Sequence, residues 1–182
     1  MDVFAVAALL SPFSEPQTEI AWKSILEISQ SANLRMDGSL HFSWHVVGTY
    51  DLPALQTILA EMARACSMFE IQTTGFGVFS SDHPVLYLPI VKTIPLSKLH
   101  QEIWNKVLPI SDHPIDYYSP SNWVPHVTLA NEETDFAGIC KAGEQLMRKP
   151  LNLKFKVDHL AILYRVGSES GILGKFPFGS VS

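Results

Sequence analysis

Residues 124–130 have the sequence VPHVTLA, in which polar and apolar side chains alternate. An alternation with a period of two is typical of a β-strand, because successive side chains of a strand point to opposite faces of the sheet. His126 and Thr128 therefore share one face, and Val127 and Leu129 share the other. The pattern predicts a strand that buries its apolar face and presents an imidazole and a hydroxyl on the opposite face.

A second stretch, in the first half of the chain, has the same pattern. Residues 39–50 have the sequence SLHFSWHVVGTY, whose β-branched and aromatic residues favour a strand. His41 and Ser43 are expected on one face, with Phe42 and Trp44 packed into the core. Each half of the chain thus contains one His-x-Ser/Thr strand.

The elements predicted around these two strands follow a similar order in both halves. Each His-bearing strand, the second of them taken as Trp123–Ala130, has one helix before it and another after it. Further strands are predicted at Val3–Leu10, Phe69–Val78, Pro84–Val91, Leu153–Leu163 and Ile172–Phe176, and helices at Thr18–Ala32, after Pro53, from near Pro95 to Val107, and at Phe136–Arg148. The turn Ser80–Asp82 is expected to join the two central strands as a pair. This order predicts an α+β fold with two lobes of antiparallel sheet and flanking helices, formed by one domain over residues 1–182.

The composition narrows the classes of function. A chain of 182 residues with 47% hydrophobic residues is long enough to bury one substantial core. Thirteen basic and eighteen acidic side chains give a net charge of -5, which argues against a protein that holds long nucleic acid through its phosphates. A small anionic substrate in a pocket remains compatible with that charge, because the local potential can differ from the net value.

The remaining composition signals concern location and metal binding. Cys66 and Cys140 form no CxxC pair, so neither a zinc site nor a disulfide framework is indicated, and a reducing cytosol fits best. The apolar run Val3–Leu10 is too short for the ~20 residues of a membrane helix. We expect a cytoplasmic protein, a monomer, without a membrane segment, a metal or a cofactor.

The two histidines suggest a specific chemistry. Cleaving a phosphodiester requires a base that activates the attacking oxygen and an acid that protonates the leaving oxygen, on opposite sides of phosphorus. His41 and His126 can supply both roles, because an unperturbed imidazole titrates near pH 6.5. The hydroxyls of Ser43 and Thr128 can donate hydrogen bonds to the non-bridging phosphate oxygens.

The segment VPHVTLA (Val124–Ala130) resembles the second signature of the 2H phosphoesterase superfamily, the group of the 2′-5′ RNA ligase and cyclic phosphodiesterase proteins. The segment Phe69–Ile90, FEIQTTGFGVFSSDHPVLYLPI, resembles the central strand pair of that family. The resemblance extends over essentially the whole chain. It implies a duplicated bilobal fold whose two motifs face each other across a central cleft, with metal-independent activity on 2′,3′-cyclic phosphates or 2′-5′ linkages.

Carried over to this sequence, the resemblance implies that His41 and His126 are the acid–base pair and that Ser43 and Thr128 bind the phosphate. The first motif departs from the common form, because it has serine in place of threonine, lacks a preceding proline, and continues with Trp44-His45 where two apolar residues are usual. Serine retains the hydroxyl, so the catalytic role of the motif is expected to be kept. The departure instead leaves the identity of the substrate open.

His45 lies on the same strand face as His41 if the alternation continues. Four strand rises of about 3.3 Å would separate the two imidazoles by ~13 Å, which is too far for a shared metal. His45 is a candidate to line one end of the cleft and contact the substrate, and a structural or solvent-facing role is an equal alternative. The tetrapeptide Ser-Asp-His-Pro occurs at Ser81–Pro84 and at Ser111–Pro114, and both copies are expected to form turns.

The sequence predicts a phosphodiesterase that acts on a small nucleotide or an RNA end, and it leaves several points open. It does not assign the base and the acid between the two histidines. Ligation of RNA ends through a 2′-5′ bond is the reverse reaction and uses the same residues. A non-catalytic nucleotide-binding or RNA-binding module is the alternative from another class. Tyrosines at four positions are candidates for stacking on a base: Tyr87, Tyr117, Tyr118 and Tyr164.

Overall fold

The computed structural model describes residues 2–10, 16–32, 40–130 and 134–179. The strands are β1 (Val3–Leu9), β2 (His41–Tyr50), β3 (Phe69–Gln72), β4 (Gly77–Phe79), β5 (Val85–Pro89), β6 (Ser111–Pro114), β7 (His126–Ala130), β8 (Lys154–Val157), β9 (His159–Val166) and β10 (Glu169–Pro177). The helices are α1 (Pro16–Ser31), α2 (Leu52–Ala65), α3 (Ile94–Val107) and α4 (Phe136–Leu146), and short 3-10 helices cover Leu108–Ile110 and Asp116–Tyr118.

The strands of the described residues pair in an antiparallel manner throughout. One sheet has five strands in the order β10-β9-β1-β2-β6, and a second has three strands in the order β4-β5-β7. These are the two sheets that the sequence predicts, so the α+β class is confirmed. Strands β3 and β8 form an additional two-stranded ribbon, and an isolated bridge from Thr73 to Ile90 connects the end of β3 to the end of β5.

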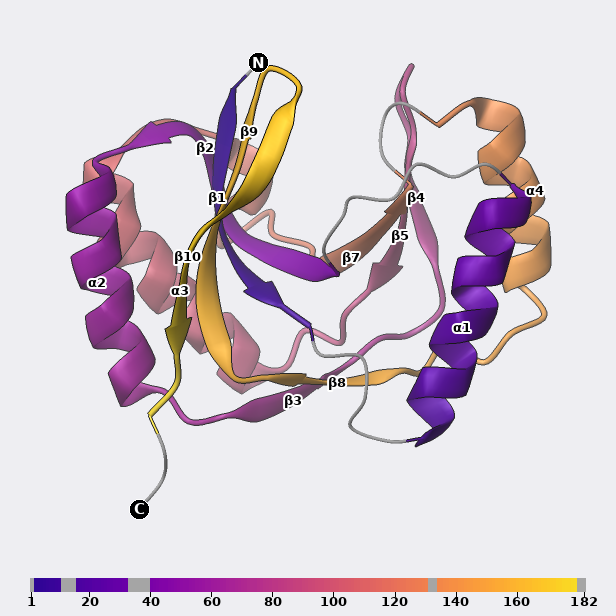
Figure 1. The fold of residues 1–182 in the computed structure, drawn as a ribbon, viewed down its shortest axis with the longest axis horizontal. Coiled ribbons are helices and arrows are strands. Elements are labelled where there is room, and N and C mark those ends of the chain that lie inside the picture. The colour runs from indigo at the N-terminus through magenta and orange to yellow at the C-terminus, as the bar shows by residue number, and fades with distance from the viewer. Residues whose placement is uncertain (1, 11–15, 33–39, 131–133, 180–182) are drawn as a thin grey trace.

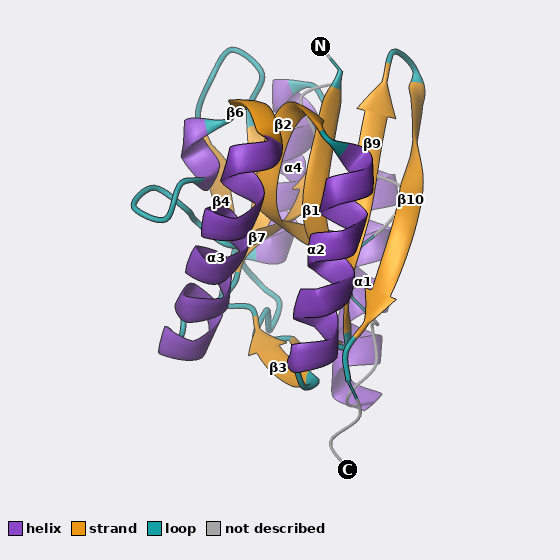
Figure 2. Cartoon of the chain, turned by 90° about the vertical axis from the view of Figure 1, so that its left-hand side faces the viewer, coloured by secondary structure: helices purple, strands orange, loops and turns teal. Residues whose placement is uncertain are grey.

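The two larger sheets lie side by side with helices on their outer sides (Figure 1). Helices α2 and α3 cover the five-stranded sheet, and Figure 2 shows them next to each other in front of it. We call this sheet with α2 and α3 the first lobe. Helices α1 and α4 pack against each other outside the three-stranded sheet, and we call that sheet with α1 and α4 the second lobe.

The lobes do not correspond to the two halves of the sequence. Helix α1 follows β1 in the chain, yet it packs with α4 in the second lobe. Helix α3 precedes β7, yet it packs on β2 in the first lobe, and β9 and β10 return from the C-terminal part of the chain to complete the sheet of the first lobe. The two helices that precede the His-bearing strands are therefore exchanged between the lobes.

Local sequence signals explain where three of the helices begin. Asp51 accepts a hydrogen bond from Ala54 N at 3.2 Å at the start of α2, and Thr93 accepts one from Leu96 N at 3.3 Å at the start of α3. Asp135 does the same for α4, and proline lies in the first turn of both α2 and α3. Side-chain acceptors at these positions satisfy amide groups that have no partner within the helix, and proline is favoured there because it lacks the amide hydrogen. None of the helices in the described residues has the length and hydropathy that a membrane span requires.

The apolar faces of the two His-bearing strands are buried as the alternation predicts. Phe42 and Val127 are each 1% exposed, and Trp44 and Leu129 are fully buried. Burial of these side chains fixes which face of each strand points away from its core, because a shift by one residue would place the apolar side chains in solvent.

Some of the predicted boundaries are wrong. The strand predicted over Phe69–Val78 is two strands, because the chain turns at Gly75, whose φ of +63° is a conformation that glycine adopts without strain. Strand β3 then pairs with β8, and β4 pairs with β5. The predicted strand Leu153–Leu163 is likewise divided at Asp158, and the strand predicted from Trp123 begins at His126.

The two Ser-Asp-His-Pro copies have different structures. Ser81–Pro84 forms a turn, as predicted, in which the amide of His83 donates to Ser81 Oγ at 3.1 Å. Ser111–Pro114 is strand β6, paired with β2 at the edge of the five-stranded sheet. Pairing with a long neighbouring strand outweighs the local turn preference there, and an edge is the position in a sheet that tolerates proline.

Candidate functional site

The polar face of β2 places the first pair of candidate residues. His41 begins the strand opposite Leu9 of β1, and Ser43 lies opposite Ala7. Both side chains are half-buried, whereas Phe42 between them points into the core. His41 and Ser43 are thus presented on the face of the strand opposite its buried core face, as the sequence predicts.

The polar face of β7 places the second pair. His126 pairs with Pro89 and Thr128 pairs with Tyr87 of β5, and β7 forms an edge of the three-stranded sheet. His126 and Thr128 are half-buried, and Val127 between them is buried. The second motif therefore has the same arrangement as the first.

The two pairs meet where β2 of the first lobe contacts β7 of the second lobe (Figure 1). Burial lowers the pKa of His126, a hydrogen bond to the Val124 carbonyl partly offsets this, and the nearby imidazole of His41 lowers the pKa further. The indole Nε1 of Trp123, three residues before His126, donates a hydrogen bond to the backbone carbonyl of Ser43 at 3.0 Å. Electrostatic and hydrogen-bonding contacts thus join two residue pairs that are distant in the sequence.

The orientation of the His126 ring is fixed by a backbone contact. Its Nδ1 lies 2.7 Å from the carbonyl oxygen of Val124. A carbonyl only accepts hydrogen bonds, so Nδ1 carries the hydrogen and donates it. In the neutral ring, Nε2 then holds the lone pair, which is the arrangement that a general base requires.

The two hydroxyls are available to a ligand. Neither Ser43 Oγ nor Thr128 Oγ1 forms a hydrogen bond with another side chain or backbone group in the described part of the chain. Both residues are half-exposed on the faces that carry His41 and His126. Each hydroxyl can therefore donate to an anionic oxygen between the two strands.

Aromatic rings form one side of the His126 environment. Phe79 and Tyr87 are stacked with their ring centroids 4.1 Å apart, and both rings contact the His126 ring edge to face, at 4.9 Å and 5.2 Å between centroids. Phe79 is 37% exposed, so one aromatic surface beside the imidazole is open to solvent. Gly77 makes this packing possible, because a Cβ atom there would lie 2.6 Å from the Tyr87 ring.

Two of the four stacking candidates that the sequence left open have informative positions. Tyr87 lies beside His126, and Tyr117 is 82% exposed on the 3-10 helix Asp116–Tyr118. Phe79 was not among the residues predicted from the sequence. The sequence marks Phe79 only by its place in the segment that resembles the family's central strand pair. Its proximity to His126 arises only when β4 pairs with β5 and β5 pairs with β7.

The predicted substrate contact of His45 is wrong. In the pairing of β1 with β2, Val6 lies opposite His45 and Ala7 lies opposite Ser43, so Trp44 is an extra residue on β2. Such a β-bulge reverses the alternation beyond it and turns His45 away from the face of His41 and Ser43. His45 is fully buried, and its Nδ1 lies 2.6 Å from the hydroxyl of Tyr50.

The surroundings of His45 support a structural role. Its ring centroid lies 4.5 Å from that of Trp104 on α3. Burial lowers the pKa of His45 to about 4, with a smaller contribution from His100. The ring is therefore neutral near pH 7 and packs as part of the core between β2 and α3.

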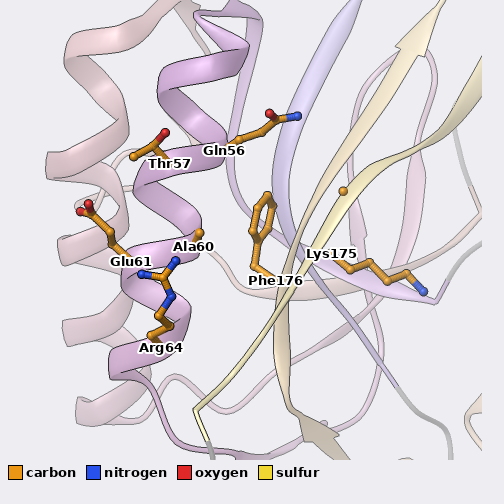
Figure 3. Close-up of a pocket in the computed structure, with 8 residues that line it drawn as sticks. Gln56, Thr57, Ala60, Glu61, Arg64, Lys175 and Phe176 are labelled. Atoms are coloured by element: carbon orange, nitrogen blue, oxygen red, sulfur yellow. The ribbon is translucent and has the colours of Figure 1, made fainter.

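None of the four candidate residues lines the surface groove between α2 and β10. A groove of about 480 Å³ between α2 and β10 is lined by Gln56, Thr57, Ala60, Glu61, Arg64, Gly174, Lys175 and Phe176 (Figure 3). Within the described ranges, no three His, Cys, Asp or Glu side chains are grouped in a manner suited to holding a metal ion.

Comparisons with known proteins relate residues 29–169 to one family and nearly the whole chain to the fold of two solved structures. The family model described as the 2′-5′ RNA ligase superfamily matches residues 29–169. Among solved structures, E. coli LigT complexed with 3′-AMP aligns over 98% of this chain and 99% of its own, with a TM-score of 0.57 and 11% identity. Kluyveromyces marxianus Usb1 with uridine monophosphate aligns over 97% of this chain and 98% of its own, with a TM-score of 0.51 and 14% identity. No curated protein matches the sequence.

Proposed function

The chain belongs to the 2′-5′ RNA ligase superfamily of 2H phosphoesterases, and from this we propose that it is a metal-independent phosphodiesterase acting on 2′,3′-cyclic phosphates or 2′-5′-linked nucleotides and RNA ends. The observation that supports this proposal most directly is the meeting of two His-x-Ser/Thr faces where β2 contacts β7. A nucleotide substrate is further supported by the two structural neighbours, which were solved with uridine monophosphate and 3′-AMP.

The proposed reaction is an in-line displacement at phosphorus. Ser43 and Thr128 donate hydrogen bonds to the non-bridging oxygens and hold the phosphorus between the two imidazoles. One imidazole takes a proton from water as the oxygen of that water bonds to phosphorus. The other imidazole gives a proton to the departing ribose oxygen as its bond to phosphorus breaks. The cyclic diester becomes a monoester with one free ribose hydroxyl.

We assign the base role in hydrolysis to His126. Its lowered pKa keeps the ring neutral at pH 7, and the bond from Nδ1 to the carbonyl of Val124 leaves the lone pair on Nε2. His41 then protonates the leaving oxygen. The exposed ring of Phe79 beside His126 offers a surface on which a base can stack, and such stacking tolerates any base because every base has an aromatic face.

Hydrolysis is favoured over ligation by the charge of the chain. Ligation uses the same four residues in reverse, and it requires that two RNA ends be held together. A net charge of -5 provides little attraction for the phosphates of a long RNA. A small cyclic nucleotide or a short RNA end needs only the local contacts of the site.

The direct test is turnover of the four 2′,3′-cyclic nucleotides in the presence of EDTA. We expect hydrolysis of at least one of them, with the product resolved into 2′- and 3′-monophosphate. A ligation assay with RNA ends that carry a 2′,3′-cyclic phosphate and a 5′-hydroxyl is run in parallel. Activity that EDTA abolishes would contradict the metal-free mechanism, and binding without turnover of any cyclic nucleotide or oligonucleotide would indicate a binding module.

The pH dependence tests the assignment of the base. A general base must be unprotonated to act, and lowering its pKa extends the neutral form to more acidic pH. We therefore expect the acid limb of kcat/KM, which reports the free enzyme, to lie below pH 6.5. The profile is measured between pH 4.5 and 9 with one cyclic nucleotide. An acid limb at or above the ordinary imidazole pKa would assign the base role to another group.

A further inference from the structure

Trp123 connects the two lobes at the site. It lies in the segment that leads into β7, three residues before His126, and it is 2% exposed. Its indole Nε1 donates to the backbone carbonyl of Ser43 on β2 at 3.0 Å. The hydrogen bond therefore joins the residue that carries one phosphate-binding hydroxyl to the segment that carries the proposed base.

The indole is held in place by several further contacts. Its ring is stacked on that of His100, with the centroids 3.8 Å apart and the planes within 8° of each other. His100 in turn donates from Nε2 to the backbone carbonyls of Trp44 and Tyr118, each at 3.0 Å. Burial lowers the pKa of His100 to about 4, so the stacked imidazole is neutral near pH 7.

The backbone of Trp123 is also held. The Nζ atom of Lys92 donates to the carbonyl oxygen of Trp123 at 2.9 Å and lies 5.7 Å from the centroid of its ring. Ring, indole N–H and backbone carbonyl are thus all engaged. Because the side chain is restrained in this way, it holds β2 and the start of β7 at a fixed separation.

We propose that Trp123 is a positioning residue, whose hydrogen bond to the Ser43 carbonyl sets the separation between the Ser43 hydroxyl and the His126 imidazole. This inference rests on the proposed function, because that separation matters for an in-line displacement. A displacement of about 1 Å between groups that act together can reduce a rate by ~100-fold. The bond crosses from one lobe to the other, so its loss allows the two groups to move apart without unfolding either strand.

Trp44 provides a matched comparison. It belongs to the same aromatic cluster, with its ring centroid 5.5 Å from that of Trp123, and it is fully buried. Its Nε1 is also buried, but it has no hydrogen-bond partner in the described part of the chain. Replacing either tryptophan by phenylalanine removes the same atoms from the same core. Only at position 123 does the change remove a hydrogen bond to the site.

The experiment compares Trp123→Phe with Trp44→Phe on a 2′,3′-cyclic nucleotide that the wild-type protein hydrolyses. We expect Trp123→Phe to lower kcat by about 10- to 100-fold with a KM close to that of the wild type. We expect Trp44→Phe to retain kcat within about 3-fold, although it removes the same atoms from the same core. Equal effects of the two variants on kcat would overturn the proposal.

A second measurement reads the position of His126 without turnover. The pKa of His126 is followed by NMR titration of its ring protons in both variants. Loosening of the contact between the lobes hydrates His126 and moves it from His41, so its pKa is expected to rise toward 6.5 in Trp123→Phe and to stay at the wild-type value in Trp44→Phe. An unchanged pKa in Trp123→Phe would contradict the positioning role.

The two measurements separate this inference from the proposed function. If the wild-type protein hydrolyses no cyclic nucleotide or oligonucleotide, the proposed function fails, and the NMR comparison still decides whether Trp123 sets the position of His126. If Trp123→Phe does not fold, 3-benzothienylalanine at position 123 keeps the shape of the indole and lacks only its N–H. The same loss of kcat and rise in the His126 pKa are expected for that variant, and wild-type values of both would overturn the proposal.

Discussion

Replacement of His126 by alanine is expected to lower kcat/KM on a 2′,3′-cyclic nucleotide by about 100- to 10,000-fold, the range for loss of a general acid or base. The variant removes the proposed proton acceptor and the ring that the Val124 carbonyl orients. The fold should be retained, because His126 is half-buried on an edge strand and the core face of β7 is unchanged. Steady-state kinetics with the protein confirmed as folded by circular dichroism measures the effect.

The same loss is expected for His41→Ala, because hydrolysis requires both a base and an acid. His83→Ala is a suitable control, since His83 is exposed in the turn Ser81–Pro84 and is expected to retain wild-type kinetics. Addition of imidazole to the buffer tests the roles further, because a small base can occupy the space left by the ring. Activity of either variant close to that of His83→Ala would rule out two-histidine catalysis.

Removal of the second hydroxyl, in Thr128→Val, is expected to lower kcat/KM by about 10- to 1000-fold, by analogy with the loss of a single donor to a developing oxyanion. Valine keeps the β-branched shape that suits the strand and lacks only the donor. Thr128→Ser retains the hydroxyl and is expected to stay within about 10-fold of the wild type. Because the Thr128 hydroxyl has no partner in the described residues, its loss leaves no other buried polar group unpaired.

Ser43→Ala tests the equivalent hydroxyl on the other strand, with Ser43→Thr as the variant that retains the donor. The Rp and Sp isomers of a 2′,3′-cyclic phosphorothioate distinguish the two non-bridging oxygens. If each hydroxyl binds a different oxygen, Ser43→Ala and Thr128→Val should each reduce the effect of sulfur for one isomer only. Kinetics of Thr128→Val and Ser43→Ala equal to those of the wild type would remove these residues from the phosphate site.

The strand alternation predicted the placement of the four candidate residues because it depends only on local geometry. Phe42 and Val127 are buried, and once the apolar face of a strand is buried the opposite face must carry the polar side chains. The order of elements predicted the α+β class for the same reason. Periodicity identifies the strands and helices, and few arrangements of antiparallel strands and helices bury such faces.

Strand alternation did not predict the face on which His45 lies. The extra residue at Trp44 changes the face of every side chain beyond it, and the sequence between Ser43 and Val46 contains no glycine or proline that would signal a bulge. The bulge depends on how β1 pairs with β2 and on what α3 packs against. Pairing and packing are tertiary properties, and a local pattern does not specify them.

For a related reason, the sequence did not predict which helix packs in which lobe. An apolar helical face shows that a helix packs against something, but it does not show against which sheet. The chain places α1 beside α4 and α3 on β2, so the predicted repeat of elements in each half does not describe the two lobes. Phe79 was missed for the same reason, because its proximity to His126 arises only through β5.

The exchange of elements between the lobes has a consequence for folding kinetics. The five-stranded sheet is completed when β1 pairs with β9, which brings together segments near opposite ends of the chain. Contacts between segments so far apart require long loops to close before the pairing stabilises them, and domains dominated by such contacts fold slowly, in milliseconds to seconds. Neither lobe is formed by one continuous stretch of sequence, so neither can be completed from one half of the chain alone. Synthesis must extend through β9 before the sheet that carries His41 and Ser43 can be complete.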